Sequence, residues 1–474
     1  MTPRPFQLAA MAACGDRFRQ GARAVVLVSP TGSGKTVMGA MMVAALVAAG
    51  KRVAWGAHRI ELVEQGAATL RAFGCSVGVN GLAPSAPVQV GMFQTWAARS
   101  VAPDADWFVA DEAHHLADKT GWTDLQRAYM QAGSKVLGLT ATPARGDGQA
   151  LAEFDDLVVA AQIGQLQGLG LLVPLKIKCP GANVGKGKIA QRPVDAYLEH
   201  AAGSSAVVFS PHVTAAREVV AEFEAAGVRC KLVTGSMPEA DRKDVLWRFH
   251  CGDVPVLVNC NVLTEGWDSP RCSTVIVARS CGSQALWIQM CGRSLRPWCV
   301  HSPKVDGCSC GKANALLLDL RGLSHHPDEG GLGRPDADRD YSLTGDGISV
   351  AAAARPCARL CLRCGAPLGD DPMCRECGKG HELVLPEVTG AELTDWQERY
   401  EATKAAVPVS RTALSLAGIL RKAEAASRAG KPWKNGAVGI RFEMIFHRRP
   451  YPSETAAAEN FNRATRNYQR EAAE

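Results

Sequence analysis

The chain has 474 residues, of which 47% are hydrophobic and 21% are charged, with a net charge of +6. This composition is typical of a globular protein, and the length is too great for a single core, so we expect about three domains. The N-terminal residues contain no apolar signal segment, and the longest apolar run, 37–49, is too short to cross a bilayer. These features exclude a simple membrane protein and predict a cytoplasmic location.

Residues 25–36 predict a phosphate-binding loop. Four apolar residues form an expected buried strand, a glycine-containing turn follows, and the Ala/Met/Val-rich run 37–49 suits a helix. Backbone N–H groups of such a loop face phosphates, while Lys35 reaches the β- and γ-phosphates and Thr36 holds Mg²⁺. Ser29 stands where the usual pattern has glycine, and a turn that binds nothing is the alternative interpretation. The expected nucleotide-binding residues are Thr31, Gly32, Ser33, Gly34, Lys35 and Thr36.

Further strands are expected at 52–57, 87–95, 106–110 and 135–140, with helical segments between them. This alternation predicts a parallel sheet with helices on both faces. Asp111 and Glu112 follow an apolar strand, at the edge where α/β sheets bind ligands. We expect Asp111 to hold Mg²⁺ and Glu112 to polarise the attacking water. Upstream of the loop, Gln7 could bond an adenine edge through its amide.

A second set of alternating elements follows a plausible hinge at 164–174, with strands expected near 205–210, 254–258 and 274–278. No phosphate-binding loop recurs, so this half is expected to complete the first site. Residues 283–296 suit a helix that presents Gln289, Arg293 and Arg296. Two arginines three positions apart would share one helical face and could reach the γ-phosphate across a cleft. Surface arginines without such a role are the alternative.

Five motifs in order resemble the superfamily 2 helicases of the DEAH-box type: 29–36, 111–114, 140–142, 256–268 and 289–296. The phrases at 57–65, 111–115, 138–145 and 264–268 are similar to RadD-like helicases and their phage relatives, which usually have Phe in place of Trp267. The resemblance implies two RecA-like lobes with ATP between them and a nucleic-acid strand across their tops. It also implies nucleotide contacts at Gly266 and Asp268, and nucleic-acid contacts at Arg59, Gln94, Thr95 and Thr264.

Two CxxC pairs separated by nine residues predict a structural Zn²⁺ site. The expected ligands are Cys361, Cys364, Cys374 and Cys377. Seventeen cysteines in a cytosolic chain indicate thiols or metal ligands rather than disulfides. The alternative to a zinc site is therefore a set of unligated thiols. A second cluster, at 299–310, has irregular spacing and gives only a weak indication of another metal.

The C-terminal tail is expected to be basic and mostly helical. Residues 401–474 contain 13 Lys/Arg and 7 Asp/Glu, which accounts for the whole positive excess. Within 421–449, Trp433, Phe442 and Phe446 lie among basic residues, a pattern that suits nucleic acid. An amphipathic helical pair with a buried aromatic core, or a docking site for a protein partner, is the alternative.

The predicted organisation is an α/β protein with two tandem RecA-like parallel-sheet domains, a small zinc module and the tail. The expected boundaries are 1–172, 173–325, a linker at 326–356, a zinc ribbon at 357–380 and the tail at 388–474. The predicted function is that of an ATP-dependent DNA helicase or translocase, with a place in DNA repair. Alternatives are a double-stranded DNA translocase, an RNA helicase and, less favoured, a non-motor clamp switched by ATP.

Overall fold

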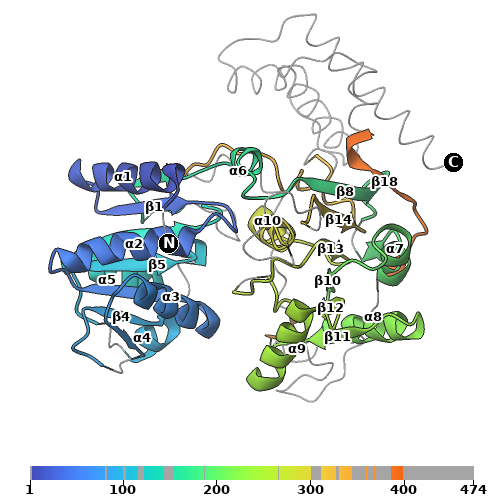
Figure 1. Ribbon diagram of the computed structural model, residues 1–474, viewed down its shortest axis with the longest axis horizontal. Coiled ribbons are helices and arrows are strands. Elements are labelled where there is room, and N and C mark those ends of the chain that lie inside the picture. Colours follow the sequence, from blue (N-terminus) through green and yellow to red (C-terminus); the bar gives the residue numbers. More distant parts are fainter. Residues whose placement is uncertain are drawn as a thin grey trace, which may run out of the picture.

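The computed structural model describes residues 3–80, 83–99, 103–115, 122–143, 151, 153–185, 187–264, 266–299, 311–326, 330–343 and 386–398, and the backbone of 359–360 and 367–368. The described chain forms two lobes, each built on a seven-stranded sheet. Figure 1 shows the lobes beside each other, the first in blue and the second in green and yellow. The prediction of two parallel-sheet lobes is confirmed.

The first sheet is parallel throughout and has the order β3-β4-β2-β5-β6-β1-β7. Its central strands are apolar except at their ends, which is typical of parallel strands covered by helices on both faces. The register places Val25 opposite Leu137, so that β1 and β6 end together. The strands are β1 (Ala24–Val28), β2 (Val53–Ala57), β3 (Val77–Val79), β4 (Val88–Met92), β5 (Trp107–Asp111), β6 (Lys135–Thr140) and β7 (Asp156–Val159).

Alternate residues of these strands enter two separate cores. Val25 and Leu27 face a core shared with the first three helices, whereas Val26 and Val28 face the fourth and fifth. This division follows from the two-residue side-chain period of a strand. The helices are α1 (Pro5–Arg19), α2 (Lys35–Ala48), α3 (Ile60–Ala72), α4 (Phe93–Arg99) and α5 (Trp122–Gln131), with a 3-10 turn η1 (Ala113–His115) after β5.

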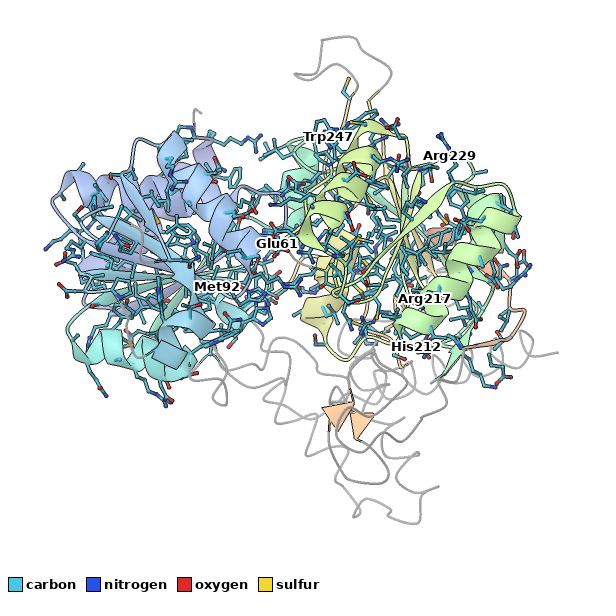
Figure 2. The ribbon with its side chains drawn as sticks, turned by 90° about the horizontal axis from the view of Figure 1, so that it is seen from below. Glu61, Met92, His212, Arg217, Arg229 and Trp247 are labelled. Carbon is cyan, nitrogen blue, oxygen red and sulfur yellow. The ribbon has the colours of Figure 1, made fainter. Side chains whose placement is uncertain are left out.

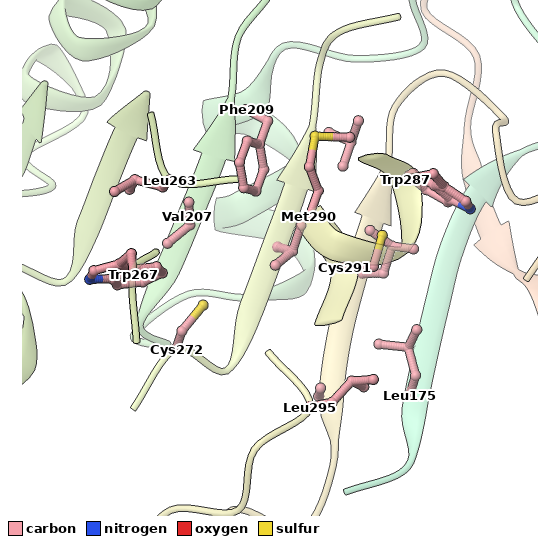
Figure 3. Close-up of a cluster of buried hydrophobic side chains, with 14 of the residues drawn as sticks. Leu175, Val207, Phe209, Leu263, Trp267, Cys272, Trp287, Met290, Cys291 and Leu295 are labelled. Carbon is pink, nitrogen blue, oxygen red and sulfur yellow. The ribbon is translucent and has the colours of Figure 1, made fainter. Parts of the chain in front are cut away.

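The second sheet has the order β11-β12-β10-β13-β14-β8-β18 and is parallel except for β18. Figure 3 shows the core on one of its faces, where Phe209 and Val207 of the sheet lie near Trp287 and Met290 of helix α10. The strands are β8 (Leu175–Pro180), β10 (Ala206–Phe209), β11 (Cys230–Val233), β12 (Val256–Asn259), β13 (Thr274–Val277), β14 (Ala315–Asp319) and β18 (Leu393–Asp395). The helices are α7 (Pro193–His200), α8 (Val213–Ala225), α9 (Glu239–Cys251) and α10 (Gln284–Gly292).

Two parts of the C-terminal region appear within the described residues. The start of the segment expected to be a helical tail is instead strand β18, which closes the edge beside β8 and buries Leu393. A free edge of that sheet would expose unpaired backbone groups, and pairing removes this cost. A second short strand, β17 (Glu387–Val388), pairs with β9 (Lys188–Ile189). In the predicted zinc ribbon, β15 (Arg359–Leu360) and β16 (Pro367–Leu368) form an antiparallel pair.

The predicted zinc ligands lie outside the described residues, as do most of the second cysteine cluster and almost all of the basic tail. Within the described ranges, no group of three or more metal-ligating side chains could hold a metal ion, and no helix is both long and apolar enough to span a membrane. Ten cysteines lie within these ranges, and seven of them are buried.

The connection between the lobes contains helix α6 (Ile163–Gly168), which Figure 1 shows between them. Ile163 and Leu166 of this helix, and Leu172 after it, belong to the core of the second lobe. Phe6 of α1 joins the same core. The second lobe therefore takes apolar residues from segments that precede its own sheet.

Residues 330–343, in the stretch expected as a linker, form an extended strap that contacts both lobes. Trp287 Nε1 donates to the carbonyl of Gly333 at 2.9 Å, which fixes one end to helix α10. Leu343 packs on the first-lobe core and accepts a backbone hydrogen bond from Leu151 at 3.1 Å. Between these ends, Gln162 Nε2 donates to the carbonyl of Arg339 at 2.7 Å, and Arg339 N donates to Gln162 Oε1 at 3.2 Å.

Replacing Gln162 with alanine should lower the free energy of unfolding by about 1–3 kcal/mol, because two backbone groups of the strap lose their partner. Urea denaturation would measure this as a lower midpoint with an unchanged slope. Gln165→Ala, on the exposed side of α6, is the matched control and should change little. Equal midpoints for the two variants would show that the hydrogen bonds between Gln162 and Arg339 contribute nothing to stability.

Candidate nucleotide site between the lobes

The loop between β1 and α2 has the shape that phosphate binding requires. Gly32 and Gly34 both have φ of +89°, a conformation that side chains rarely adopt. Ser29, the departure from the usual glycine, is buried, and its hydroxyl lies 2.5 Å from that of Ser33. Ser33 Oγ in turn donates to the carbonyl of Pro30 at 2.6 Å. The serine therefore braces the loop from within, and the loop keeps its shape without the glycine.

Gln7 lies directly against this loop. Its Nε2 donates to the carbonyl of Ser33 at 3.0 Å, and its Oε1 accepts from Arg4 N at 3.0 Å. A Cβ atom on Gly34 would lie only 2.6 Å from Gln7 Nε2. The structure thus places the glutamine beside the predicted phosphate site, with both amide ends on the protein backbone.

The acidic end of β5 faces the loop from the neighbouring part of the sheet. Lys35 Nζ and Glu112 Oε1 form an ion pair of 2.6 Å in which both side chains are largely buried. Asp111 is 2% exposed and accepts a hydrogen bond from Glu112 N at 3.1 Å. Burial raises the pKa of Asp111 to about 7, an effect that the charge of Lys35 opposes and that of Glu112 reinforces.

Glu112 also has φ of +53°, which is unusual for a residue with a side chain. Non-glycine residues in this conformation cluster at functional sites. The strain at this position therefore agrees with the role expected for Glu112.

His114, which was not among the predicted site residues, links this acidic end to other motifs. Its Nδ1 lies 3.0 Å from Thr140 Oγ1 and 3.5 Å from Glu112 Oε2. Its Nε2 lies 3.3 Å from Gln289 Nε2 of the second lobe. A ring protonated on Nδ1 would satisfy these contacts, because Nε2 would then accept from the glutamine amide. The DEAH sequence itself was the signal that could have identified this residue.

The expected helix at 283–296 is shorter than predicted, because α10 ends at Gly292 and Arg293 is its C-terminal cap. The two arginines therefore do not share a helical face, and the chain turns between them. Arg293 donates to the carbonyls of Thr264, at 3.2 Å from Nε, and Trp267. Arg296 pairs with Asp268, and a Cβ atom on Gly32 would lie 3.1 Å from its Cγ. Arg296 thus packs against the phosphate loop.

Lys312 is a second residue that the sequence did not single out. Its Nζ donates to the carbonyls of Pro270, Cys272 and Ser294 at 2.7–3.0 Å. The pKa of Lys312 is lowered to about 8, chiefly by burial, an effect that Cys272 opposes and the charge of Arg296 reinforces. The ammonium group therefore joins the segment after Asp268 to the segment before Arg296. No local pattern marks such a lysine, because its three acceptors come from two distant segments.

Further contacts cross between the lobes beside this site. Arg242 of α9 pairs with Glu61 of α3 at 2.7 Å, and Figure 2 shows Glu61 at the boundary of the two lobes. Arg59 Nη1 donates to the carbonyl of Val262 at 3.3 Å. A Cβ atom on Gly292 would lie 3.4 Å from Thr31 Cβ, so the end of α10 touches the loop.

The residues expected along nucleic acid lie at the carboxyl ends of strands. Arg59 follows β2, and Gln94 and Thr95 follow β4. Gln94 Nε2 donates to the carbonyl of His58 at 2.8 Å. Thr264 is only 4% exposed, and its hydroxyl donates to the carbonyl of Asn261 at 3.2 Å. Gly266, expected to contact nucleotide, has φ of +71° and lies near Glu61.

The geometry suits a nucleoside triphosphate with a divalent cation. The loop offers backbone N–H groups where a side chain would not fit, and Asp111 is a buried carboxyl group whose ionisation a cation would favour. Two sheets with one phosphate loop between them define the class as a P-loop protein with two RecA-like lobes.

Comparison with known proteins identifies the family. Residues 1–145 match the family described as type III restriction enzyme, res subunit, and residues 190–297 match the helicase conserved C-terminal domain. Together these matches cover more than half of the chain. The chain belongs to the superfamily 2 helicases, as the motif order predicted.

Individual relatives agree with this assignment. A 51.5 kDa protein of a Lactococcus phage (isolate 7-9) is 27% identical over 57% of this chain and 62% of its own length. The Schizosaccharomyces pombe protein irc3, which bears the name of a mitochondrial ATP-dependent helicase, is 26% identical over 73% of this chain and 62% of its own. This chain thus spans 62% of the length of both relatives.

Among solved structures, a fragment assigned to the HsdR subunit of a type I restriction enzyme from Vibrio vulnificus YJ016 superposes with a TM-score of 0.53. The two sequences are 20% identical, and the superposition covers 69% of this chain and 67% of the fragment. At this identity the likeness shows the shared two-lobed fold.

Proposed function

We propose that this protein is an ATP-dependent DNA motor that moves along or unwinds DNA. The observation that carries the proposal is the meeting of both lobes at one phosphate loop, with Arg296 against Gly32 and Gln289 against His114. Such a site is complete only when the lobes are together, so nucleotide binding would favour their approach. The match to a restriction-enzyme subunit supports DNA over RNA, since restriction enzymes act on DNA.

In the proposed reaction, Lys35 exchanges its partner. It holds Glu112 at 2.6 Å in the structure. A bound triphosphate would attract Lys35 to its own oxygens and release Glu112 to orient water in line with the γ-phosphorus. Thr36 and Asp111 would hold Mg²⁺, which neutralises charge on the phosphates. Arg296 would leave Asp268 to meet the charge that develops in the transition state.

The contacts of His114 and Thr140 would change when nucleotide binds at this site or is hydrolysed. The imidazole contacts Glu112 on one side and Gln289 of the second lobe on the other. Movement of Glu112 on hydrolysis would therefore disturb a contact that holds the lobes together. Repeated closure and opening of the lobes would step the strand that lies across them, for which Arg59, Gln94, Thr95 and Thr264 remain the proposed contacts.

Two assays in parallel test the function. ATP turnover should rise with DNA, and either strand displacement on a forked duplex or displacement of a triplex-forming oligonucleotide should accompany it. Strand displacement identifies a helicase, while triplex displacement alone identifies a double-stranded DNA translocase. Stimulation by RNA but not DNA would overturn the DNA assignment. Binding of ATP and DNA without multiple turnover would leave an ATP-switched clamp as the better description.

We further propose that the predicted zinc ribbon and basic tail form a DNA-binding arm. The support comes from the sequence, namely the two CxxC pairs and the charge of residues 401–474. The antiparallel pair β15–β16 brackets the first CxxC pair, as a small ribbon would require. A docking role toward a protein partner is the alternative for the tail.

Ending the chain near residue 350 should keep ATP binding, because both sheets are formed by then except for β18. DNA binding should weaken, and its dependence on salt should become shallower, because phosphate contacts are lost. Fluorescence anisotropy at several salt concentrations would measure this. Metal analysis should find zinc in the full chain and less in the shortened one. Equal salt slopes would contradict the DNA-binding arm.

A further inference from the structure

Three histidine rings lie in a continuous row beside the nucleotide site. The rings of His114 and His115 have centroids 4.2 Å apart, and those of His115 and His58 are 4.0 Å apart. They come from different segments, because His58 follows β2 while the other two follow β5. These two strands are paired neighbours in the sheet, which explains why their ends meet. His58 and His114 are buried.

One end of the row reaches the hydrolytic residues. His114 Nδ1 lies 3.5 Å from Glu112 Oε2 and 3.0 Å from Thr140 Oγ1. His114 and His115 belong to the same short turn, η1, so neither can move far without the other. Glu112, immediately before this turn, has the strained φ of +53°. Small movements of the turn would therefore change the placement of its carboxylate.

The other end reaches the face where nucleic acid is proposed to lie. His58 immediately precedes Arg59, and its carbonyl accepts a hydrogen bond from Gln94 at 2.8 Å. Trp122 supports this end, with its ring 6.3 Å from that of His58 and 5.3 Å from that of Phe93, which precedes Gln94. A nucleic-acid strand that binds Arg59 or Gln94 would thus displace the backbone of His58 directly.

We propose that His58 and His115 are positioning residues that couple nucleic-acid binding to hydrolysis through this row of rings. The inference rests on the proposed function and names a path within the first lobe. The rings are in close contact, so displacement of His58 cannot be absorbed by empty space and must move His115 or break the contact. Movement of His115 carries the η1 turn, and with it His114, relative to Glu112.

Steady-state ATP turnover of the full chain, with and without a single-stranded DNA oligonucleotide, tests the proposal. His115→Ala should reduce the stimulation of kcat by DNA about tenfold. Turnover without DNA, the KM for ATP and the Kd for DNA should all stay within about twofold of the original protein. His115→Phe keeps a ring in the row and should retain most of the stimulation. The control is His200→Ala, on α7 of the second lobe.

A cycle with His58→Ala separates coupling from simple packing. If the two rings act in one path, the double variant should lose no more stimulation than either single variant. Equal loss of turnover with and without DNA would instead indicate a packing role and overturn the proposal. Stimulation that survives His115→Ala would also overturn it, while leaving the motor function intact. If neither DNA nor RNA changes the ATP turnover of the original protein, the proposed function is overturned, and the coupling with it.

Discussion

Glu112→Gln should bind ATP normally and lower turnover by about 10²–10⁴-fold, because an amide cannot take the proton of the attacking water. The structure gives a further reason to expect intact binding. The lysine that pairs with Glu112 at 2.6 Å would be released, and its ammonium group would remain available to the phosphates. Lys35→Ala should behave differently, with weaker ATP binding as well as lost turnover.

A fluorescent ATP analogue would measure binding, and phosphate release would measure turnover. Glu199→Gln, an exposed change at the end of α7, is the matched control for the loss of one carboxylate. Near-normal turnover of Glu112→Gln would show that another residue activates the water. Loss of binding in that variant would instead point to a structural role of the ion pair with Lys35.

Arg296→Ala should lower kcat by about 10³-fold with little change in the KM for ATP. The side chain packs on Gly32 of the phosphate loop yet pairs with Asp268 of its own lobe, so it is held close to the site without a phosphate to bind. Its strongest contact would form only as charge develops on the transferred phosphoryl group, and such a contact raises kcat rather than ground-state affinity.

Arg296→Lys should restore little activity, because an ammonium group cannot reproduce the fork of a guanidinium. Arg229→Ala is the control, since Figure 2 places Arg229 on the outer side of the second lobe, away from Glu61 and the first lobe. A raised KM with unchanged kcat would argue against the role proposed for Arg296. Arg293, whose donors already bind the carbonyls of Thr264 and Trp267, should act mainly by holding that loop.

The sequence determined the architecture of both lobes because the determining signals are local. Apolar runs of strand length, separated by helical segments, specify parallel strands buried on both faces. The glycines of the phosphate loop and the acidic pair after β5 also act within a few residues of chain. Each of these features can be recognised without knowing what packs against it.

Contacts between distant segments were decided only by the tertiary structure. Helix α10 ends at Gly292, and Arg293 at its C-cap bonds the carbonyl of Thr264, so helical spacing gave the wrong geometry for the two arginines. Strand β18 forms because the edge of β8 needs a partner, a condition absent from the sequence of the tail itself. The strap at 330–343 lacks any periodic pattern, and its order comes from partners such as Gln162 and Trp287.

The same reason applies to the site. Lys35, Asp111 and Glu112 could be found from the sequence because each belongs to a short motif with a known chemistry. His58, His115 and Lys312 could not, because their importance lies in which rings or carbonyls surround them. Two paired strands bring His58 beside His115, although they are more than fifty positions apart in the sequence. Local residue patterns fix what a segment becomes, whereas only the folded sheet fixes what it touches.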